Sequence, residues 1–386
     1  MALFESPSTS PAERVRAASG RVASASGTWV LIGENVDHFG GVTLVGTSSL
    51  RAAAAVSPRT DGVISIAARG PLGQEFSAQL PYSDEPADGL ARRWWGLVHT
   101  LVQRQVLSRD TSGMDITVES DVPVGAGLGA LYAADAAIAL ALAGGHDDVD
   151  TAPFRARLAE ICSHAVDTYS SLPVLRARHS VALRGAEGVS VVDYADGSLT
   201  QAPHPSRHGV RVFSVSQELG APFTQSREAI AERRAFIDAA CSNFGVSSLR
   251  QLPDAPGRAV QWVEARRAAG DEAAPEPEAA RRWVQFCESE TLRSLAAAKA
   301  LRSRRANELF TLLNSPSESH GLTSPDALVA LARERGAVAA RPAAIGTSDA
   351  VIAFVPVQEA DSFAAAMARE FEVVEVAAGE PARLEG

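Results

Sequence analysis

Two carboxylates and an amide lie close together in a short segment near the N-terminus. Glu34, Asn35 and Asp37 follow an apolar run and precede Gly40 and Gly41, so the two carboxylates stand three residues apart on a predicted turn. Carboxylates at this spacing can accept hydrogen bonds from adjacent hydroxyl groups and orient a sugar-like ligand without reacting with it. The three residues are therefore candidate ligand-binding residues, and the alternative is a solvated turn.

A second candidate site is the glycine-rich loop at residues 123–129. Gly125, Gly127 and Gly129 alternate with apolar residues and precede an Ala- and Leu-rich segment that predicts a buried helix. Free N–H groups and the dipole at the start of a helix favour an anion, and glycines let the backbone approach a phosphate closely. The loop predicts a phosphate site, although such loops also serve packing alone.

The elements that would position these residues are a mixture of strands and helices. Between residues 20 and 70, short apolar runs predict antiparallel strands, with breaks at Gly40-Gly41 and a hairpin turn at Asp61-Gly62. Further strands are predicted at residues 114–118, 188–194, 209–216 and 350–355. Helices are predicted at residues 88–106, 133–142, 227–243, 258–268, 279–306 and 325–335. Because strands and helices do not alternate regularly, the fold class is α+β.

Composition excludes several classes of protein. The chain has 386 residues, 46% hydrophobic and 21% charged, with a net charge of −10 and scattered arginines, so no basic face is predicted for a nucleic acid. Cys162, Cys241 and Cys287 stand alone, which fits a reducing compartment and argues against a zinc site. No apolar run approaches the roughly 20 residues of a membrane span. We expect a cytoplasmic protein that binds no metal of its own through these cysteines.

The order of motifs along the chain resembles the galactokinases, a family of the GHMP kinase superfamily. Residues 27–41 resemble G-R-V-N-L-I-G-E-H-x-D-Y-x-x-G, and residues 121–128 are similar to the phosphate-loop motif P-L-G-A-G-L-S-S-S-A. Residues 336–353 are similar to G-A-R-M-T-G-G-G-F-G-G-C-x-I-A, although only Arg341 and Gly346 persist from its middle. The resemblance implies a two-domain GHMP kinase fold with mixed and antiparallel sheets, packed helices and a cleft between domains at residues 1–205 and 206–386.

Several residues that this family uses for phosphoryl transfer are replaced. The signature Arg aligns with Thr28, and the Asp that takes the sugar proton aligns with Arg176. The serines of the phosphate loop align with Gly129, Ala130 and Leu131. The resemblance implies ATP and Mg²⁺ as cofactors, whereas these replacements predict weak nucleotide binding or none.

The replaced Asp also changes the charge of the predicted cleft. A buried cation needs a partner, because an unpaired charge costs several kcal/mol in order of magnitude. We therefore expect Arg176, or Arg178 if the alignment shifts by two residues, to form a salt bridge with Glu34 or Asp37.

Three hypotheses for the function follow. The first is a catalytically impaired, galactokinase-like protein that binds a sugar or a related small ligand. The second is an active ATP-dependent galactose kinase whose catalytic roles have moved to residues such as His38, His179 or Asp193. The third is a non-catalytic scaffold with vestigial sites.

Overall fold

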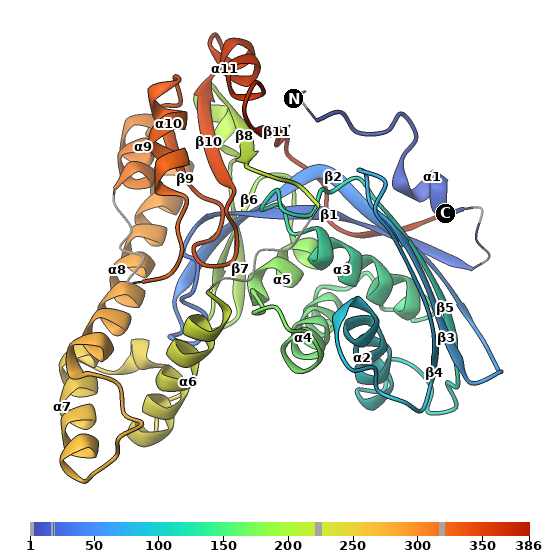
Figure 1. Cartoon of the computed structure of the whole chain (residues 1–386), viewed down its shortest axis with the longest axis horizontal. Coiled ribbons are helices and arrows are strands. Elements are labelled where there is room, and N and C mark those ends of the chain that lie inside the picture. The colour runs from blue at the N-terminus through green and yellow to red at the C-terminus, as the bar shows by residue number, and fades with distance from the viewer. Residues whose placement is uncertain (1–3, 17, 19, 221–225, 316–320) are drawn as a thin grey trace.

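The computed structural model describes residues 4–16, 18, 20–220, 226–315 and 321–386. Two sheets organise these residues, a large one near the N-terminus and a small one near the C-terminus, and helices pack around both (Figure 1). The predicted α+β class is therefore correct.

The large sheet has eight strands. Its main order is β12-β1-β2-β5-β3-β4, β6 pairs with β2, and β7 pairs with β6. The pairing of β3 with β5 is parallel and the other pairs among the described strands are antiparallel. The strands are Arg21–Ile32 (β1), Val42–Pro58 (β2), Val63–Arg69 (β3), Glu75–Pro81 (β4), Met114–Ser120 (β5), Val189–Asp193 (β6), Ser198–Ala202 (β7) and Arg383–Glu385 (β12).

The small sheet is antiparallel, in the order β11-β8-β10-β9. Its strands are Val210–Ser216 (β8), Ala339–Pro342 (β9), Val351–Pro356 (β10) and Glu372–Glu375 (β11). Strand β9 carries Arg341, which pairs with Ile352 of β10 in the ladder. Strand β9 is an edge strand of this sheet, and Thr347 and Ser348 of the C-terminal motif line a pocket together with the glycine loop.

The α-helices of the described residues fall into two groups. Those of the N-terminal half are Pro11–Val15 (α1), Gly89–Gln103 (α2), Ala130–Ala143 (α3), Ala152–Tyr169 (α4) and Arg176–Arg184 (α5). Those of the C-terminal half are Arg227–Phe244 (α6), Ala255–Ala268 (α7), Pro277–Arg302 (α8), Ala306–Asn314 (α9), Asp326–Glu334 (α10) and Ala360–Met367 (α11).

Helix α3 forms the centre of the main core. It is buried from Ala133 to Ala143, and it packs against β1 and β2. Small alanine side chains allow such close contact with a sheet, and alanine also has the highest helix propensity. The glycine loop that precedes this helix is therefore held by a rigid, buried element.

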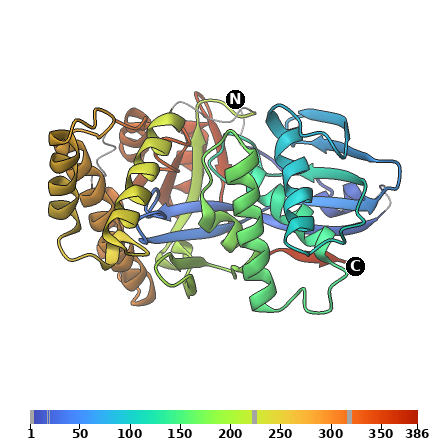
Figure 2. The same cartoon turned by 90° about the horizontal axis from the view of Figure 1, so that it is seen from below.

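The long strands β1 and β2 run through the middle of the molecule (Figure 2). They pair antiparallel from Arg21 with Val56 to Ile32 with Leu44, so the turn between them lies at the end nearest α8. The sequence prediction of a break at Gly40-Gly41 is confirmed. Two distant parts of the chain, the turn and α8, thereby meet.

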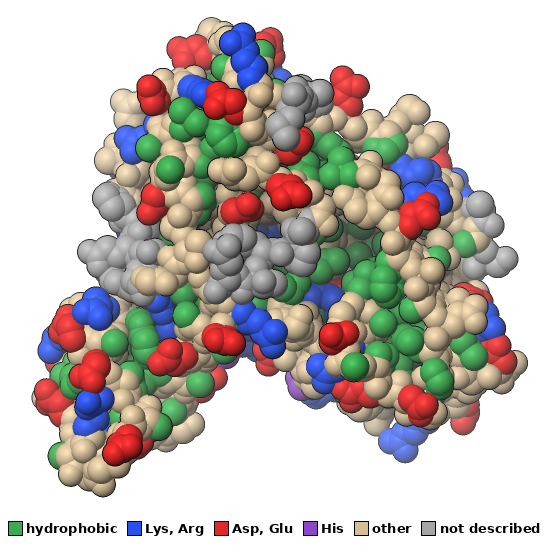
Figure 3. All heavy atoms as spheres, viewed as in Figure 1, with side chains coloured by type: hydrophobic (Ala, Val, Ile, Leu, Met, Phe, Trp, Pro, Cys, Tyr) green, Lys and Arg blue, Asp and Glu red, His purple; other side chains and the backbone are tan. Residues whose placement is uncertain are grey.

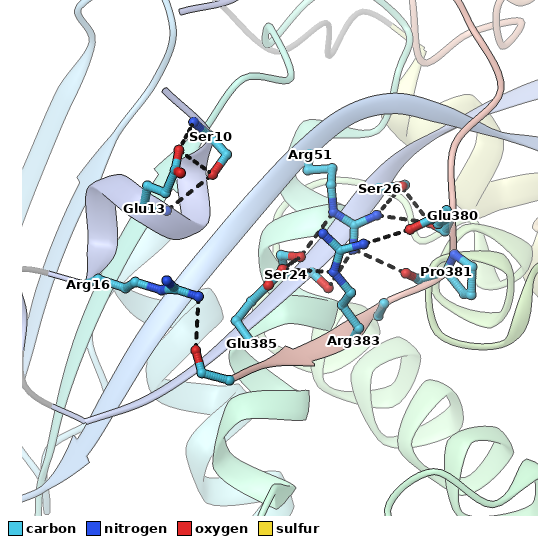
Figure 4. A network of polar contacts seen from close by, with 12 residues as sticks. Ser10, Glu13, Arg16, Ser24, Ser26, Arg51, Glu380, Pro381, Arg383 and Glu385 are labelled. Atoms are coloured by element: carbon cyan, nitrogen blue, oxygen red, sulfur yellow. Dashed lines mark hydrogen bonds and ion pairs between the residues drawn. The ribbon is translucent and has the colours of Figure 1, made fainter. Parts of the chain in front are cut away.

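The C-terminal segment returns to the large sheet. Strand β12 pairs with β1, and Arg51 of β2 donates hydrogen bonds to the carbonyl oxygens of Glu380 and Pro381, both at 3.1 Å (Figure 4). Arg51 also donates to the hydroxyl groups of Ser24 and Ser26 at 3.0 and 2.9 Å. The domain division at residues 205 and 206 remains a prediction, and residues 383–385 belong to the sheet of the first half.

Two local predictions were wrong or incomplete. Asp61-Gly62 lies between β2 and β3, but these strands do not pair, because β5 inserts between them. Helices α4 and α5 were not predicted, although α4 buries Phe154, Leu158 and Cys162 at helical spacing. The first error arises because a turn signal does not identify the partner of a strand.

Candidate functional site

The turn between β1 and β2 holds the three predicted ligand-binding residues. Gly33 has a φ of 93° and Asn35 a φ of 59°, a left-handed conformation that Asn tolerates better than most residues. Helix α8 fixes the turn, because the N–H group of Gly33 donates to Glu290 at 3.2 Å. The backbone of the turn is thus set by a contact that is distant in sequence.

Glu34 is bound inside the protein. The residue is 3% exposed, and the Nη2 atom of Arg341 lies 3.3 and 3.2 Å from its two carboxylate oxygens. The same nitrogen lies 3.2 Å from Glu290, which also contacts Arg293 at 2.7 Å. Burial raises the pKa of Glu34, and the Arg341 guanidinium acts in the opposite direction. This carboxylate already has strong internal partners.

Asp37 and Asn35 differ from Glu34. The Asp37 side chain is 3% exposed and lies 3.2 Å from Nη2 of Arg234, but neither carboxylate oxygen has a hydrogen-bond donor. The side-chain oxygen of Asn35 is also buried without a donor, whereas its amide nitrogen donates to the carbonyl of Ile345 at 3.1 Å. Buried polar atoms are nearly always hydrogen-bonded, so unpaired acceptors in one turn indicate a place for bound hydroxyl groups or water.

The predicted salt bridge of Arg176 or Arg178 with the turn is wrong. Arg176 is exposed at the start of α5. Arg178 is buried and donates to the carbonyl oxygen of Thr28 and, at 3.0 Å, to that of Gly127. Residues two apart on a helix point to different faces, and α5 places Arg178, not Arg176, on its buried face. Because α5 was not predicted, the sequence did not show which arginine is buried.

The true partners of the two carboxylates come from the C-terminal half. Arg341 lies on β9 and Arg234 on α6, more than 190 residues from the turn. Arg341 was recognised as a remnant of the C-terminal motif, and Arg234 ends the segment Glu232-Arg233-Arg234, which also resembles galactokinase sequence. The signals were therefore present, but only the fold pairs each cation with its carboxylate.

The glycine loop has the backbone that its sequence predicts. Gly125, Gly127 and Gly129 have φ values of 93°, 67° and 66°, where other residues are strained. A Cβ atom at Gly127 would lie 2.5 Å from the Cβ of Ala343, and one at Gly129 would lie 2.8 Å from Nη1 of Arg178. The three glycines therefore let the loop fit between β1, α5 and the C-terminal motif.

A pocket of about 100 Å³ opens at this loop. Figure 3 shows the same face of the molecule, with hydrophobic side chains gathered in the hollow between the parts built on the two sheets. The residues that line the pocket come from the loop, the start of α3, the segment before α5, α5 itself and the C-terminal motif: Pro123, Val124, Gly125, Gly127, Leu128, Gly129, Ala130, Leu131, Tyr132, Leu172, Pro173, Leu175, Arg178, Thr347 and Ser348. None of these residues is acidic.

Side chains of the C-terminal motif fill space beside the glycine loop. Ala343, Ala344 and Ile345 are buried, and Ile345 packs with Ile230 and Leu322. These side chains occupy space where the resembling motif has glycines. Asp349 is partly buried, and burial raises the pKa of its carboxyl group, to which Glu218 contributes.

The three residues considered as substitute catalytic groups lie apart. His38 contacts Asp238 at 2.8 Å, and Asp193, at the end of β6, contacts Arg250 at 2.6 Å. His179 is fully buried, and burial lowers its pKa. Its ring nitrogens lie 3.0 Å from Ser163 and 3.0 Å from Asp135, which Arg93 also contacts. His179 therefore belongs to an internal polar network, and it does not line the loop pocket.

The described residues contain no group of three or more His, Cys, Asp or Glu residues placed to hold a metal ion. None of their helices is long and apolar enough to cross a membrane.

Comparison with known proteins gives similarities in sequence and in fold. No protein-family model matches the chain. A galactokinase from Streptomyces coelicolor is 27% identical over 248 residues, which span 62% of this chain and 59% of that protein's length.

The structural matches extend over nearly the whole chain. A Lactococcus lactis galactokinase complexed with galactose matches with a TM-score of 0.74 and 14% identity, covering 96% of this chain and 98% of that one. A Methanococcus jannaschii mevalonate kinase matches at 0.54 and 11%, covering 96% and 99%, and a Cytophaga hutchinsonii homoserine kinase at 0.54 and 12%, covering 95% and 97%. The fold expected from the sequence is confirmed.

Proposed function

We propose that this chain, a member of the GHMP kinase superfamily with a galactokinase fold, binds a hydroxyl-rich, sugar-like ligand at Asn35 and Asp37 without phosphorylating galactose. The observation that carries the proposal is that the side-chain oxygen of Asn35 and both carboxylate oxygens of Asp37 are buried without a hydrogen bond, although the ion pair with Arg234 lies 3.2 Å from Oδ2 of Asp37. Sugar hydroxyl groups are donors of the right kind, and they would satisfy these atoms at once. The galactose bound to the Lactococcus lactis relative is consistent with such a ligand.

The groups that surround the glycine loop lack those that phosphoryl transfer needs. Thr28 carries no charge, Arg176 is exposed, and the pocket lining contains no carboxylate that could accept a proton. Removing a general base lowers the rate by about 10²–10⁴-fold, and removing one electrostatic donor lowers it by about 10²–10³-fold. These effects do not simply multiply, but together they leave little phosphoryl transfer.

Nucleotide binding is proposed to be weak or absent. Ala343 packs against Gly127, and Asp349 adds an acidic group near Ser348 at the edge of the pocket. Like charge repels the phosphates of ATP. With the phosphate-loop serines replaced, no hydroxyl group remains at residues 129–131 to contact phosphate or Mg²⁺.

Each of the two alternatives, an active kinase and a non-catalytic scaffold, is favoured by one observation. Arg178 brings a guanidinium group to the backbone of Thr28, which favours a kinase with relocated groups. The ion pair of Glu34 with Arg341 removes one sugar acceptor, which favours a scaffold. A kinase would still need a base, and a scaffold leaves the unpaired oxygens of Asp37 unexplained.

The test combines a binding measurement with an activity measurement. Calorimetry with galactose and a panel of hexoses should detect a ligand. Asp37→Asn should weaken the binding of that ligand by about tenfold or more, because a hydrogen bond to a charged group is lost. Asp238→Asn is the matched control, since Asp238 is exposed and contacts His38 from outside the turn. Transfer of labelled phosphate from Mg-ATP should not exceed a buffer control.

Two results would contradict the proposal. Turnover near 1 s⁻¹, within the range of about 1–100 s⁻¹ for kinases, would restore the active-kinase hypothesis. If none of the sugars tested binds, the scaffold is favoured. If the Asp37→Asn and Asp238→Asn variants bind a sugar equally well, the sugar site does not include Asp37.

A further inference from the structure

A second pocket lies at the C-terminal end of α8. It measures about 510 Å³ and shares no lining residue with the pocket at the glycine loop. Leu301, in the last turn of α8, lies about 16 Å along the helix axis from Glu290, so this pocket is separate from the turn between β1 and β2. Its lining comes from the loop between α5 and β6, the segment between β7 and β8, and the end of α8: Glu187, Pro203, His204, Arg207, His208, Leu301 and Arg304.

Two arginines line this pocket without a partner of opposite charge. The guanidinium groups of Arg207 and Arg304 form no ion pair or hydrogen bond with any other residue that the structure describes. Of the residues that line the pocket, only Glu187 is acidic. The lining therefore carries an excess of positive charge, and both arginines remain able to donate hydrogen bonds.

Arg304 occupies a position that glycine usually takes. It follows the C-cap of α8 with a φ of 55°, and the N–H group of Arg305 donates to the carbonyl oxygen of Ala300 at 3.0 Å. This is the pattern of a Schellman motif, in which a left-handed residue ends the helix. A residue with a side chain is strained at such a φ, whereas glycine is not. The helix end therefore gives no reason for an arginine, and the pocket gives one.

His204 carries a buried N–H group that has no acceptor. The residue is 6% exposed, and its Nδ1 atom accepts a hydrogen bond from the N–H group of Ser206 at 3.2 Å. Burial lowers the pKa of His204 to about 4, so the ring is neutral at pH 7 and its proton lies on Nε2. This Nε2 atom is buried without a hydrogen-bond partner among the described residues. Buried donors are nearly always paired, so this N–H group indicates a bound acceptor.

Two neighbouring rings add further unpaired nitrogens. The ring of Trp29 lies nearly perpendicular to that of His204, with the ring centres 5.7 Å apart, and its Nε1 donor is also buried without a described partner. The same holds for Nε2 of His208, whose pKa is lowered by burial and by the charge of Arg304. Because donors and cations gather here, the expected occupant is an acceptor with negative charge.

A metal ion fits this lining poorly. His204, His208 and Glu187 are residue types that bind metals, but the described part of the chain has no group of three such side chains placed to hold one. The proton on Nε2 of His204 also blocks that nitrogen, because a histidine ligand binds a metal through an unprotonated nitrogen. Two guanidinium groups would in addition repel a cation.

We infer that this pocket binds a small organic anion through a phosphate or carboxylate group held by Arg207 and Arg304. Guanidinium groups bind both kinds of anion through paired, charge-assisted hydrogen bonds. The N–H group of His204 would donate to the same ligand, and Glu187 suits a hydroxyl group on it, because a carboxylate accepts hydrogen bonds. The site is independent of the proposed sugar site, since the two share no residue.

The test measures binding by calorimetry with citrate, glycerol 3-phosphate and glycerol at one ionic strength. Citrate, glycerol 3-phosphate or both should bind at least about tenfold more tightly than glycerol, because charge-assisted hydrogen bonds to anions are strong. Arg304→Gly should weaken this binding by about tenfold or more, because one guanidinium group is lost. Glycine suits a φ of 55°, so the variant should unfold at no lower temperature than the unaltered protein when both are free of ligand.

Arg305→Gln is the matched control. It removes one positive charge from the next residue, which pairs with Glu308 at 3.1 Å and does not line the pocket. Anion binding by this variant should equal that of the unaltered protein. Binding of citrate alone would assign a carboxylate to the site and binding of glycerol 3-phosphate alone a phosphate, and either result supports the inference.

Three results would overturn the inference. If neither anion binds better than glycerol, the unpaired donors belong to water. If Arg304→Gly and Arg305→Gln weaken binding equally, the effect is one of general charge. If binding survives Arg304→Gly, the anion lies elsewhere, and its loss in Arg178→Met would place it at the glycine loop. None of these results bears on sugar binding at Asp37, which galactose tests separately.

Discussion

Two buried arginines, Arg341 and Arg178, are equally exposed but have opposite electrostatic surroundings. Arg341 and Arg178 are each 3% exposed. Arg341 contacts two carboxylates, Glu34 and Glu290, which raise its pKa against the effect of burial. Burial lowers the pKa of Arg178, which contacts carbonyl oxygens instead. A charge that the fold neutralises serves stability, whereas a charge that it leaves uncompensated is suited to binding an anion.

The largest effect is expected from Arg341→Met. The change leaves Glu34 and Glu290 buried with one fewer cation, and breaking a buried ion pair costs about 3–5 kcal/mol. Denaturant unfolding measures the free energy of unfolding of the variant and of the unaltered protein. Adding Glu34→Gln to the Arg341→Met variant should recover part of the loss, because one unpaired charge is removed, and a purely additive double variant would argue against this pairing.

A buried histidine extends the comparison to a group that titrates at moderate pH. Burial lowers the pKa of His204 from 6.5 to about 4. The unfolded chain therefore binds more protons than the folded one between these values, so stability rises with pH across this window and is fully present above about 6.5. The loss on acidification to pH 4 is about 3 kcal/mol at most, from 1.36 kcal/mol per pKa unit.

The control for this pH dependence is His204→Asn, which keeps an acceptor near the N–H group of Ser206 but does not titrate. Unfolding free energies measured from pH 7 to pH 4 should change less in the variant. An unchanged slope would mean that other groups cause the pH dependence.

A smaller effect is expected from Arg51→Met. The guanidinium holds the C-terminal segment through hydrogen bonds to Glu380 and Pro381, and burial lowers its pKa to about 10. Losing these bonds should cost about 1–3 kcal/mol. Amide hydrogen exchange of β12 should accelerate more than that of β8. Uniform acceleration across both sheets would instead indicate global destabilisation.

The smallest effect is expected from Arg178→Met in the absence of ligand. Losing the hydrogen bonds to the carbonyl oxygens of Thr28 and Gly127 costs about 1–3 kcal/mol, but removing a buried charge that has no anionic partner offsets this cost, so stability should change by less than about 1 kcal/mol. Thermal unfolding of the Arg178→Met and Arg341→Met variants, measured side by side, tests this difference in stability. A loss as large as that of Arg341→Met would show that both arginines are structural, and the comparison would fail.

The sequence predicted the local elements that carry the site. Apolar runs broken by glycine predicted the turn that holds Asn35 and Asp37, and the Gly-rich loop before an Ala-rich segment predicted the loop before α3. These features depend on neighbouring residues, because backbone conformation and helix propensity are local properties. The order of motifs also predicted the fold, which the structural comparison confirms.

Tertiary structure alone decided which strands pair and which charged side chains meet. The sequence could not show that β5 separates β2 from β3, that β12 returns to β1, or that Arg341 and Arg234 neutralise the carboxylates of the turn. Each of these contacts joins segments far apart in the chain, and charge or hydrophobicity at one position does not specify which distant residue it meets. The sequence alone therefore determined which groups are available for chemistry, and long-range packing decided which of them remain unpaired.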